Sequence, residues 1–155
     1  MARSQEPVKG EESVVIGPVA TNRDAAQKIV LGVDDAPENL IFLQAAVKAG
    51  GYPFLGATSG IECLALVPQV MPRLILLDIE MPGMNGLETC KRLRAMPEAQ
   101  HIPVAFLTGH QTAKFVEAGI AAGGNDFIVK PFDPIKLIER IRYWMSREVE
   151  SVGRQ

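Results

Sequence analysis

The feature that most constrains the fold of this chain is a series of short apolar runs in which apolar and polar residues do not alternate. A strand with one face in water would alternate, so these runs predict strands covered on both faces, as in parallel sheets. Their length, their β-branched residues and the Gly and Pro beside them favour strands over buried helix segments. The runs are residues 29–33, 54–57, 74–77, 104–107 and 127–129, of which 54–57 is the faintest.

Amphipathic stretches between and after the runs predict five helices. Ser59 and Glu62 fit a capping box, in which Ser59 is the N-cap and Glu62 reaches back toward it. Asp133 followed by Pro134 is typical of an N-cap and the first helical position. Gly119 lowers the propensity of the fourth helix by about 1 kcal/mol relative to Ala. Apolar residues with helical spacing are Leu40, Leu43 and Val47, then Leu87, Cys90 and Leu93, and then Leu137, Ile138, Ile141, Trp144 and Met145, and the fourth helix is expected within 111–122.

The order of these elements predicts the domain organisation. Five strands alternating with five helices give a (βα)5 chain with helices on both faces of a mostly parallel sheet. The length of 155 residues fits one domain, which we expect to span residues 28–147. Residues 1–27 are expected to be a flexible N-terminal tail, because Val14–Ile16 is their only apolar patch, and residues 148–155 a C-terminal tail.

Composition excludes several classes of protein. A hydrophobic share of 47% with 22% charged residues supports a sizeable core and argues against a disordered chain. The net charge of -2 gives no support for direct nucleic-acid binding. Cys63 and Cys90 form no CxxC pair, which favours a reducing compartment. No apolar run approaches the roughly 18 residues that span a bilayer, and no signal peptide is evident, so we expect a cytoplasmic protein without membrane insertion.

Polar side chains follow four of the five runs. Asp34 and Asp35 follow the first, Asp78 the third, Thr108 the fourth and Lys130 the fifth. Each has an ordinary explanation by itself, such as a helix cap or a turn. Because ligands of open α/β sheets bind beyond the carboxyl ends of the strands, the residues together predict one shared site.

The charges of this site indicate its chemistry. Three carboxylates repel one another unless a cation neutralises them, and Lys130 supplies one positive charge. An all-oxygen ligand set favours Mg²⁺. A metal, an ammonium and a hydroxyl form a clamp for a phosphoryl group, and Asp can be the nucleophile that accepts it. The residues therefore predict phosphoryl transfer onto an aspartate.

These motifs resemble the receiver domain of two-component response regulators, in particular the stand-alone, chemotaxis-regulator-like receivers. The resemblance covers residues 28–147 and implies a flavodoxin-like, doubly wound five-stranded parallel sheet with strand order 2-1-3-4-5. The segments that carry it are Val33-Asp34-Asp35 with Asn39, Leu77 to Gly86, Leu107-Thr108-Gly109 and Phe127 to Phe132.

The resemblance implies a role for each acidic residue. Asp78 would accept the phosphoryl group. Asp35, Asp78 and the backbone carbonyl of Glu80 would ligate Mg²⁺, and Asp34 would hold a metal-bound water. No other cofactor is expected. The donor would be a sensor histidine kinase or a histidine phosphotransfer protein, and the chain would be a signalling switch rather than an enzyme.

The remaining motif residues are implied to sense the phosphoryl group. Lys130 would pair with a phosphoryl oxygen, and Thr108 would donate its hydroxyl to it. Phe127 matches the aromatic residue whose rotamer follows activation. The Lys130–Pro131 bond matches a cis peptide of the family.

Two residues occupy positions that vary within the family. Glu80 lies two residues past Asp78, and His110 lies two residues past Thr108. We hypothesise that both face the water that hydrolyses the acyl phosphate and so set its lifetime. The alternative for His110 is a solvated loop histidine.

Two other functions use similar residues. A phosphohydrolase of haloacid-dehalogenase type also has an Asp nucleophile, but its acidic pair follows the nucleophile, whereas Asp34 and Asp35 precede Asp78. An FMN carrier would need a phosphate loop after the first strand, where this chain is acidic.

The output of the predicted switch is open. The downstream protein target is unknown, and the chain fits a stand-alone regulator, a phosphorelay intermediate or a piece of a longer protein. Ile120, Phe132 and Ile135 are candidates for a partner face or a possible homodimer, with ordinary packing as the alternative.

Overall fold

The computed structural model describes residues 28–110 and 112–147. Both predicted tails, 1–27 and 148–155, lie outside the described residues, and so does the patch Val14–Ile16. The strands are β1 (Val30–Val33), β2 (Phe54–Ala57), β3 (Leu74–Asp78), β4 (Val104–Thr108) and β5 (Asp126–Val129). The helices are α2 (Pro37–Ala49), α3 (Gly60–Val70), α4 (Gly86–Arg94), α5 (Ala113–Ala122) and α6 (Pro134–Ser146), with a short 3-10 turn, η3 (Pro97–Ala99), before β4.

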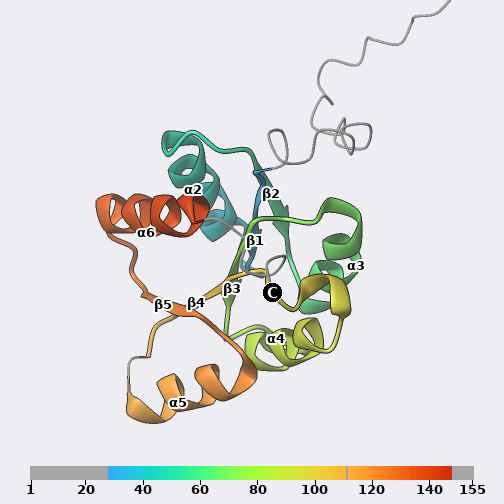
Figure 1. Cartoon of the computed structure of the whole chain (residues 1–155). Helices are drawn as coiled ribbons and strands as arrows, with labels where there is room; N and C mark the ends of the chain where they lie inside the picture. The colour runs from blue at the N-terminus through green and yellow to red at the C-terminus, as the bar shows by residue number, and fades with distance from the viewer. Residues whose placement is uncertain (1–27, 111, 148–155) are drawn as a thin grey trace, which may run out of the picture.

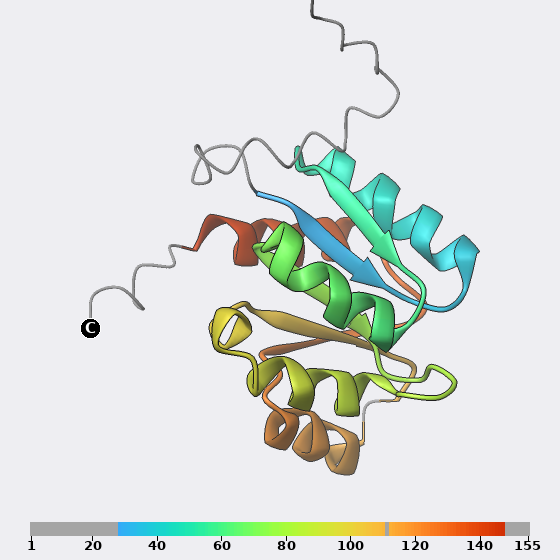
Figure 2. The ribbon, with the colours of Figure 1, turned by 90° about the vertical axis from the view of Figure 1, so that its right-hand side faces the viewer.

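The five strands form one parallel sheet in the order β2-β1-β3-β4-β5, which confirms the predicted fold. Helices α2 and α6 cover one face, and α3, α4 and α5 cover the other (Figure 1). The arrowheads of β1 and β2 point the same way in Figure 2, as they do in a parallel sheet. All five strands therefore end at the same edge.

Two hydrophobic cores lie on the two faces of the sheet. Leu31 and Val33 pack in the core beneath α3, α4 and α5, whereas Val30 packs in the core beneath α2 and α6. Because successive residues of a strand point to opposite faces, both kinds of position are apolar here. This double burial is why the strand sequences show no alternation.

Side-chain caps fix where the helices begin. Ser59 accepts a hydrogen bond from the Glu62 backbone N–H at 3.0 Å, as the capping box predicts. The Glu62 carboxylate, however, accepts from the N–H of Thr58 at 2.8 Å, one residue further back than expected. Asp133 caps α6 as predicted. Helix α5 begins at residue 113, because Thr112 is its N-cap.

The edge of the sheet opposite the strand ends is held by two polar networks. Asp126 accepts hydrogen bonds from Arg140 Nε at 2.8 Å and from Trp144 Nε1 at 2.7 Å, which fastens α6 to β5. Arg94 donates to the carbonyl of Gly123 at 3.0 Å, which links α4 to the end of α5.

Two further features are the state of the cysteines and the apolar character of the helices. Cys63 and Cys90 are free and buried, and burial raises the pKa of the Cys63 thiol to about 12, so this thiol stays protonated. Within the described part of the chain, no helix has both the length and the apolar character needed to cross a membrane.

Candidate functional site

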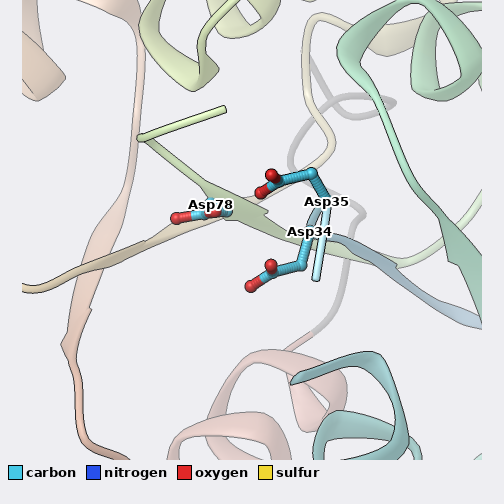
Figure 3. A group of neighbouring side chains, drawn as sticks. All are labelled: Asp34, Asp35 and Asp78. Carbon is cyan, nitrogen blue, oxygen red and sulfur yellow. The ribbon is translucent and has the colours of Figure 1, made fainter. Parts of the chain in front are cut away.

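Three predicted acidic residues meet where β1 and β3 end. Asp34 and Asp35 follow β1 directly, and Asp78 is the last residue of β3. One oxygen from each lies within 4.8 Å of the others. Figure 3 shows the three carboxyl groups directed into the same space. This is the only group of potential metal ligands of its kind in residues 28–110 and 112–147.

Asp34 is buried and accepts several hydrogen bonds. It accepts hydrogen bonds from the backbone N–H of Ala36 at 3.0 Å and from Asn39 Nδ2 at 3.2 and 3.1 Å. The N-cap of α2 is Ala36, so Asp34 is not the side-chain cap that its sequence position also allowed. Asn39, which the motif contained without a role, is the residue that orients Asp34.

Lys130 is the cation of the site. Its Nζ lies 3.1 Å from Asp78 Oδ1 and 3.4 Å from Asp34 Oδ2, and it reaches the cluster from the end of β5. Pairing with the two carboxylates raises the pKa of the ammonium although burial opposes this, so Lys130 stays charged. One ammonium faces three carboxyl groups, and the site keeps a negative charge.

The surroundings of Asp78 disfavour its ionised form. Its side chain is almost fully buried and accepts hydrogen bonds from Lys130 and from the Glu80 N–H at 3.3 Å. Burial raises the pKa of Asp78, the contact with Lys130 lowers it, and repulsion by Asp34 raises it further, with a net upward shift. A second cation would remove that penalty. Oxygen donors with a residual negative charge fit Mg²⁺.

Glycine at position 86 gives the loop after β3 its shape. A Cβ at Gly86 would lie 2.3 Å from the carbonyl oxygen of Asp78 and 2.7 Å from the Cα of Ile79. The Gly86 N–H also donates to the Ile79 carbonyl at 2.8 Å. Helix α4 therefore starts directly against the backbone of Asp78, which no side chain at this position would allow.

Thr108 is buried at the end of β4 beside the cluster. Its hydroxyl accepts from the His110 N–H at 2.9 Å and donates to the His110 carbonyl at 3.1 Å. The hydroxyl is therefore engaged with its own loop. Lys130–Pro131 is a cis peptide bond, as the resemblance implied.

Glu80 and His110 meet across the site, which sequence reasoning did not foresee. His110 Nε2 lies 2.8 Å from Glu80 Oε2, with 47% and 57% of the two side chains exposed. The His110 ring stacks on Phe115 with centroids 4.7 Å apart. The only signal was the equal spacing of the two residues from Asp78 and Thr108. His110 is therefore an exposed loop residue that contacts Glu80, and its role in the lifetime of the acyl phosphate stays a prediction.

Phe127, the predicted switch residue, is half-buried on β5. Its ring centroid lies 5.5 Å from that of Phe106 on β4. Phe127 therefore packs, partly buried, against the core beneath α5.

Known proteins resemble this chain in sequence and in fold. The family described as the response regulator receiver domain matches residues 30–142. The response regulator PleD of Caulobacter vibrioides is 36% identical over 113 residues, which are 73% of this chain and 25% of PleD. The chain thus spans a quarter of that relative.

Two solved structures share the fold. The chemotaxis protein CheY4 of Vibrio cholerae has a TM-score of 0.73 and 29% identity, covering 76% of this chain and 98% of CheY4. The receiver domain of the sensor histidine kinase PA1611 of Pseudomonas aeruginosa has a TM-score of 0.72 and 25% identity, covering 79% of this chain and all of that domain. That structure contains a magnesium ion in its active-site cleft.

The raised pKa of Asp78 predicts a pH-dependent cost to stability in metal-free buffer. The folded state holds this proton more tightly than the unfolded state, so ionised Asp78 destabilises the fold above the ordinary carboxyl pKa of about 4. We expect Asp78→Asn to be more stable than wild type at pH 7 by about 1 kcal/mol, the size of a typical single substitution. The difference should shrink as pH falls toward 4.

Urea denaturation with EDTA present checks this expectation. Glu117→Gln, which neutralises an exposed carboxylate on α5, controls for the loss of one negative charge. An Asp78→Asn protein less stable than wild type at pH 7 would contradict the assignment of an uncompensated charge.

Proposed function

The chain belongs to the response regulator receiver family, and from this membership we propose that Asp78 is the carboxylate that accepts its phosphoryl group. A receiver domain is a phosphoryl-accepting signalling switch. The observation that carries the assignment is the Lys130 ammonium, which lies 3.1 Å from Asp78 and 3.4 Å from Asp34 at the end of the sheet. The phosphohydrolase alternative is rejected, since the family match and the strand order are those of a receiver.

The transfer follows from the position of these groups. A carboxylate oxygen of Asp78 attacks the phosphorus of a phosphohistidine on the donor. The new P–O bond forms as the P–N bond breaks, and the imidazole nitrogen leaves with the electron pair and gains a proton. Lys130 already contacts Asp78, so its ammonium lies beside the phosphoryl oxygens and stabilises their charge.

We expect Mg²⁺ at the acidic cluster. Asp35, Asp78 and the backbone carbonyl of Glu80 would hold the ion, and Asp34 would orient a bound water. When bound, the ion neutralises charge on the phosphoryl oxygens. The magnesium ion in the related PA1611 receiver supports this assignment, as does the charge that Lys130 leaves uncompensated.

The response begins at Thr108. To donate to a phosphoryl oxygen, its hydroxyl must give up the hydrogen bond that it now donates to the His110 carbonyl. The space that Thr108 vacates would let Phe127 turn inward. The surface formed by α5, β5 and α6 would then repack, which is a local event that biases a two-state element. Beyond this self-catalysed phosphorylation and dephosphorylation, we propose no enzymatic activity.

The donor must reach the edge of the sheet where Asp78 lies. Exposed apolar side chains near this edge include Ile41 and Phe42 on α2 and Ile135 in the first turn of α6. Phe132 is partly buried and its ring lies 5.5 Å from that of Phe42, which fits ordinary packing. A kinase or phosphotransfer protein is therefore the proposed partner at this edge, and a homodimer and a cytoplasmic location remain predictions.

Phosphotransfer from candidate donors tests the function. We expect the radiolabelled phosphoryl group to be transferred to the wild-type protein from an autophosphorylated histidine kinase or a phosphotransfer protein. This transfer should not occur in the presence of EDTA or when Asp78 is replaced by Asn. Asp133→Asn is the matched control, because Asn also caps helices and residue 133 lies outside the site. Label that persists on Asp78→Asn would refute the assignment, and sustained phosphate release from a monoester would revive the phosphohydrolase.

The lifetime of the acyl phosphate tests the Glu80–His110 pair. Because this pair spans the two loops beside Asp78, we expect its loss to admit water and to speed hydrolysis about threefold to tenfold, a barrier change of up to about 1.4 kcal/mol. The rate is measured as loss of label from Glu80→Ala and His110→Ala. Glu88→Ala is the control, because it removes an exposed ion pair with Arg92 and should leave the rate of hydrolysis unchanged. Unchanged rates in both site variants would dispose of the hypothesis.

A further inference from the structure

The ring of Phe127 occupies a notch in α5 that exists only because residue 119 is glycine. A Cβ at Gly119 would lie 2.4 Å from Cζ and 2.6 Å from Cε2 of Phe127, and 3.2 Å from Cδ2 of Phe106. The first two distances are far inside van der Waals contact. Any side chain at position 119 would therefore displace the ring or the helix.

A glycine inside a helix needs a reason, because it costs about 1 kcal/mol relative to Ala. The close approach of the Phe127 ring supplies that reason. Helix α5 buries only Gly119 and Ala122, whereas α6 buries Leu137, Ile141 and Met145. Of its larger apolar side chains, Phe115 packs partly buried against the core beneath α5, so the Phe127 ring is one of few apolar contacts that hold α5.

The two ends of α5 differ in how they are held. At the C-terminal end, the Gly124 N–H donates to the Gly119 carbonyl at 2.9 Å, and Arg94 holds the Gly123 carbonyl. At the N-terminal end, Thr112 caps the helix soon after the Thr108 loop. The notch lies between a fixed end and the end nearer the site, where a small displacement of the ring would tilt the helix.

We propose that Gly119 is a positioning residue for Phe127 and sets the balance between the two states of the switch. The missing side chain at position 119 lets the ring pack where it does while the Thr108 hydroxyl is bonded to its own loop, which is the resting arrangement. A side chain at position 119 therefore destabilises this arrangement and favours the other. A ligand of the Asp78 site that prefers the second state then binds more tightly, because the two equilibria are linked. The proposal rests on the proposed function of Asp78.

Beryllofluoride with magnesium, a mimic of the phosphoryl group, is the probe. We expect Gly119→Ala to bind it at least about fivefold more tightly than wild type, the lower end of typical coupling between sites. In the free variant, the Phe127 ring and α5 amide resonances should move toward their positions in beryllofluoride-bound wild type. Unchanged affinity together with unchanged resonances overturns the proposal.

Two further variants separate the ring contact from a general loosening of the helix. In Phe127→Leu, the added Gly119→Ala should no longer change the affinity, because the ring is gone. Ala121→Gly lowers the helix propensity of α5 by about 1 kcal/mol at an exposed position, and it should lower stability without raising the affinity. An equal gain of affinity in Ala121→Gly overturns the proposal.

The outcomes also distinguish this inference from the function on which it rests. If Gly119→Ala alone does not fold, the Gly119→Ala, Phe127→Leu double variant must fold, and its failure to do so overturns the proposal. Wild type that does not bind beryllofluoride refutes the function of Asp78 itself. If wild type binds beryllofluoride and Gly119→Ala binds it with equal affinity, only the role of Gly119 is refuted.

Discussion

The ammonium of Lys130, placed between two buried carboxylates, is the interaction on which the rest of the site depends. Its Nζ lies 3.4 Å from Asp34 Oδ2 and 3.1 Å from Asp78 Oδ1, so it holds the two carboxylates close together. Burial and, to a smaller extent, repulsion by Asp34 nevertheless raise the pKa of Asp78, so its anion is disfavoured in the absence of another cation. The arrangement is therefore suited to a divalent ion and to a phosphoryl group, which bring opposite charges to the same place.

The fold makes this crowding possible. A parallel sheet covered on both faces brings the ends of β1, β3, β4 and β5 to one edge, so residues distant in the sequence meet there. The opposite edge is fixed by Asp126 and Arg94. At the site edge, the Thr108 hydroxyl is bonded to its own loop. A change in this bonding is the kind of local event that biases a two-state element.

Sequence reasoning predicted the strands and the residues at their ends, because double burial and strand-end chemistry leave local signals. The strand order 2-1-3-4-5 came only from the family resemblance, since apolar runs carry no information on which strands pair. The Glu80–His110 pair, the role of Asn39 and the notch at Gly119 were missed. Each depends on the distance between side chains or backbone of two different elements or loops, which no local pattern encodes.

The central claim is that Asp78, beside one ammonium and one divalent ion, becomes a mixed anhydride. Intact mass spectrometry after incubation with acetyl phosphate tests it without any partner protein. With Mg²⁺, wild type should gain the mass of a single phosphoryl group, and neither wild type in EDTA nor Asp78→Asn should gain it. A wild-type mass that never rises, or an equal rise in Asp78→Asn, would contradict the account.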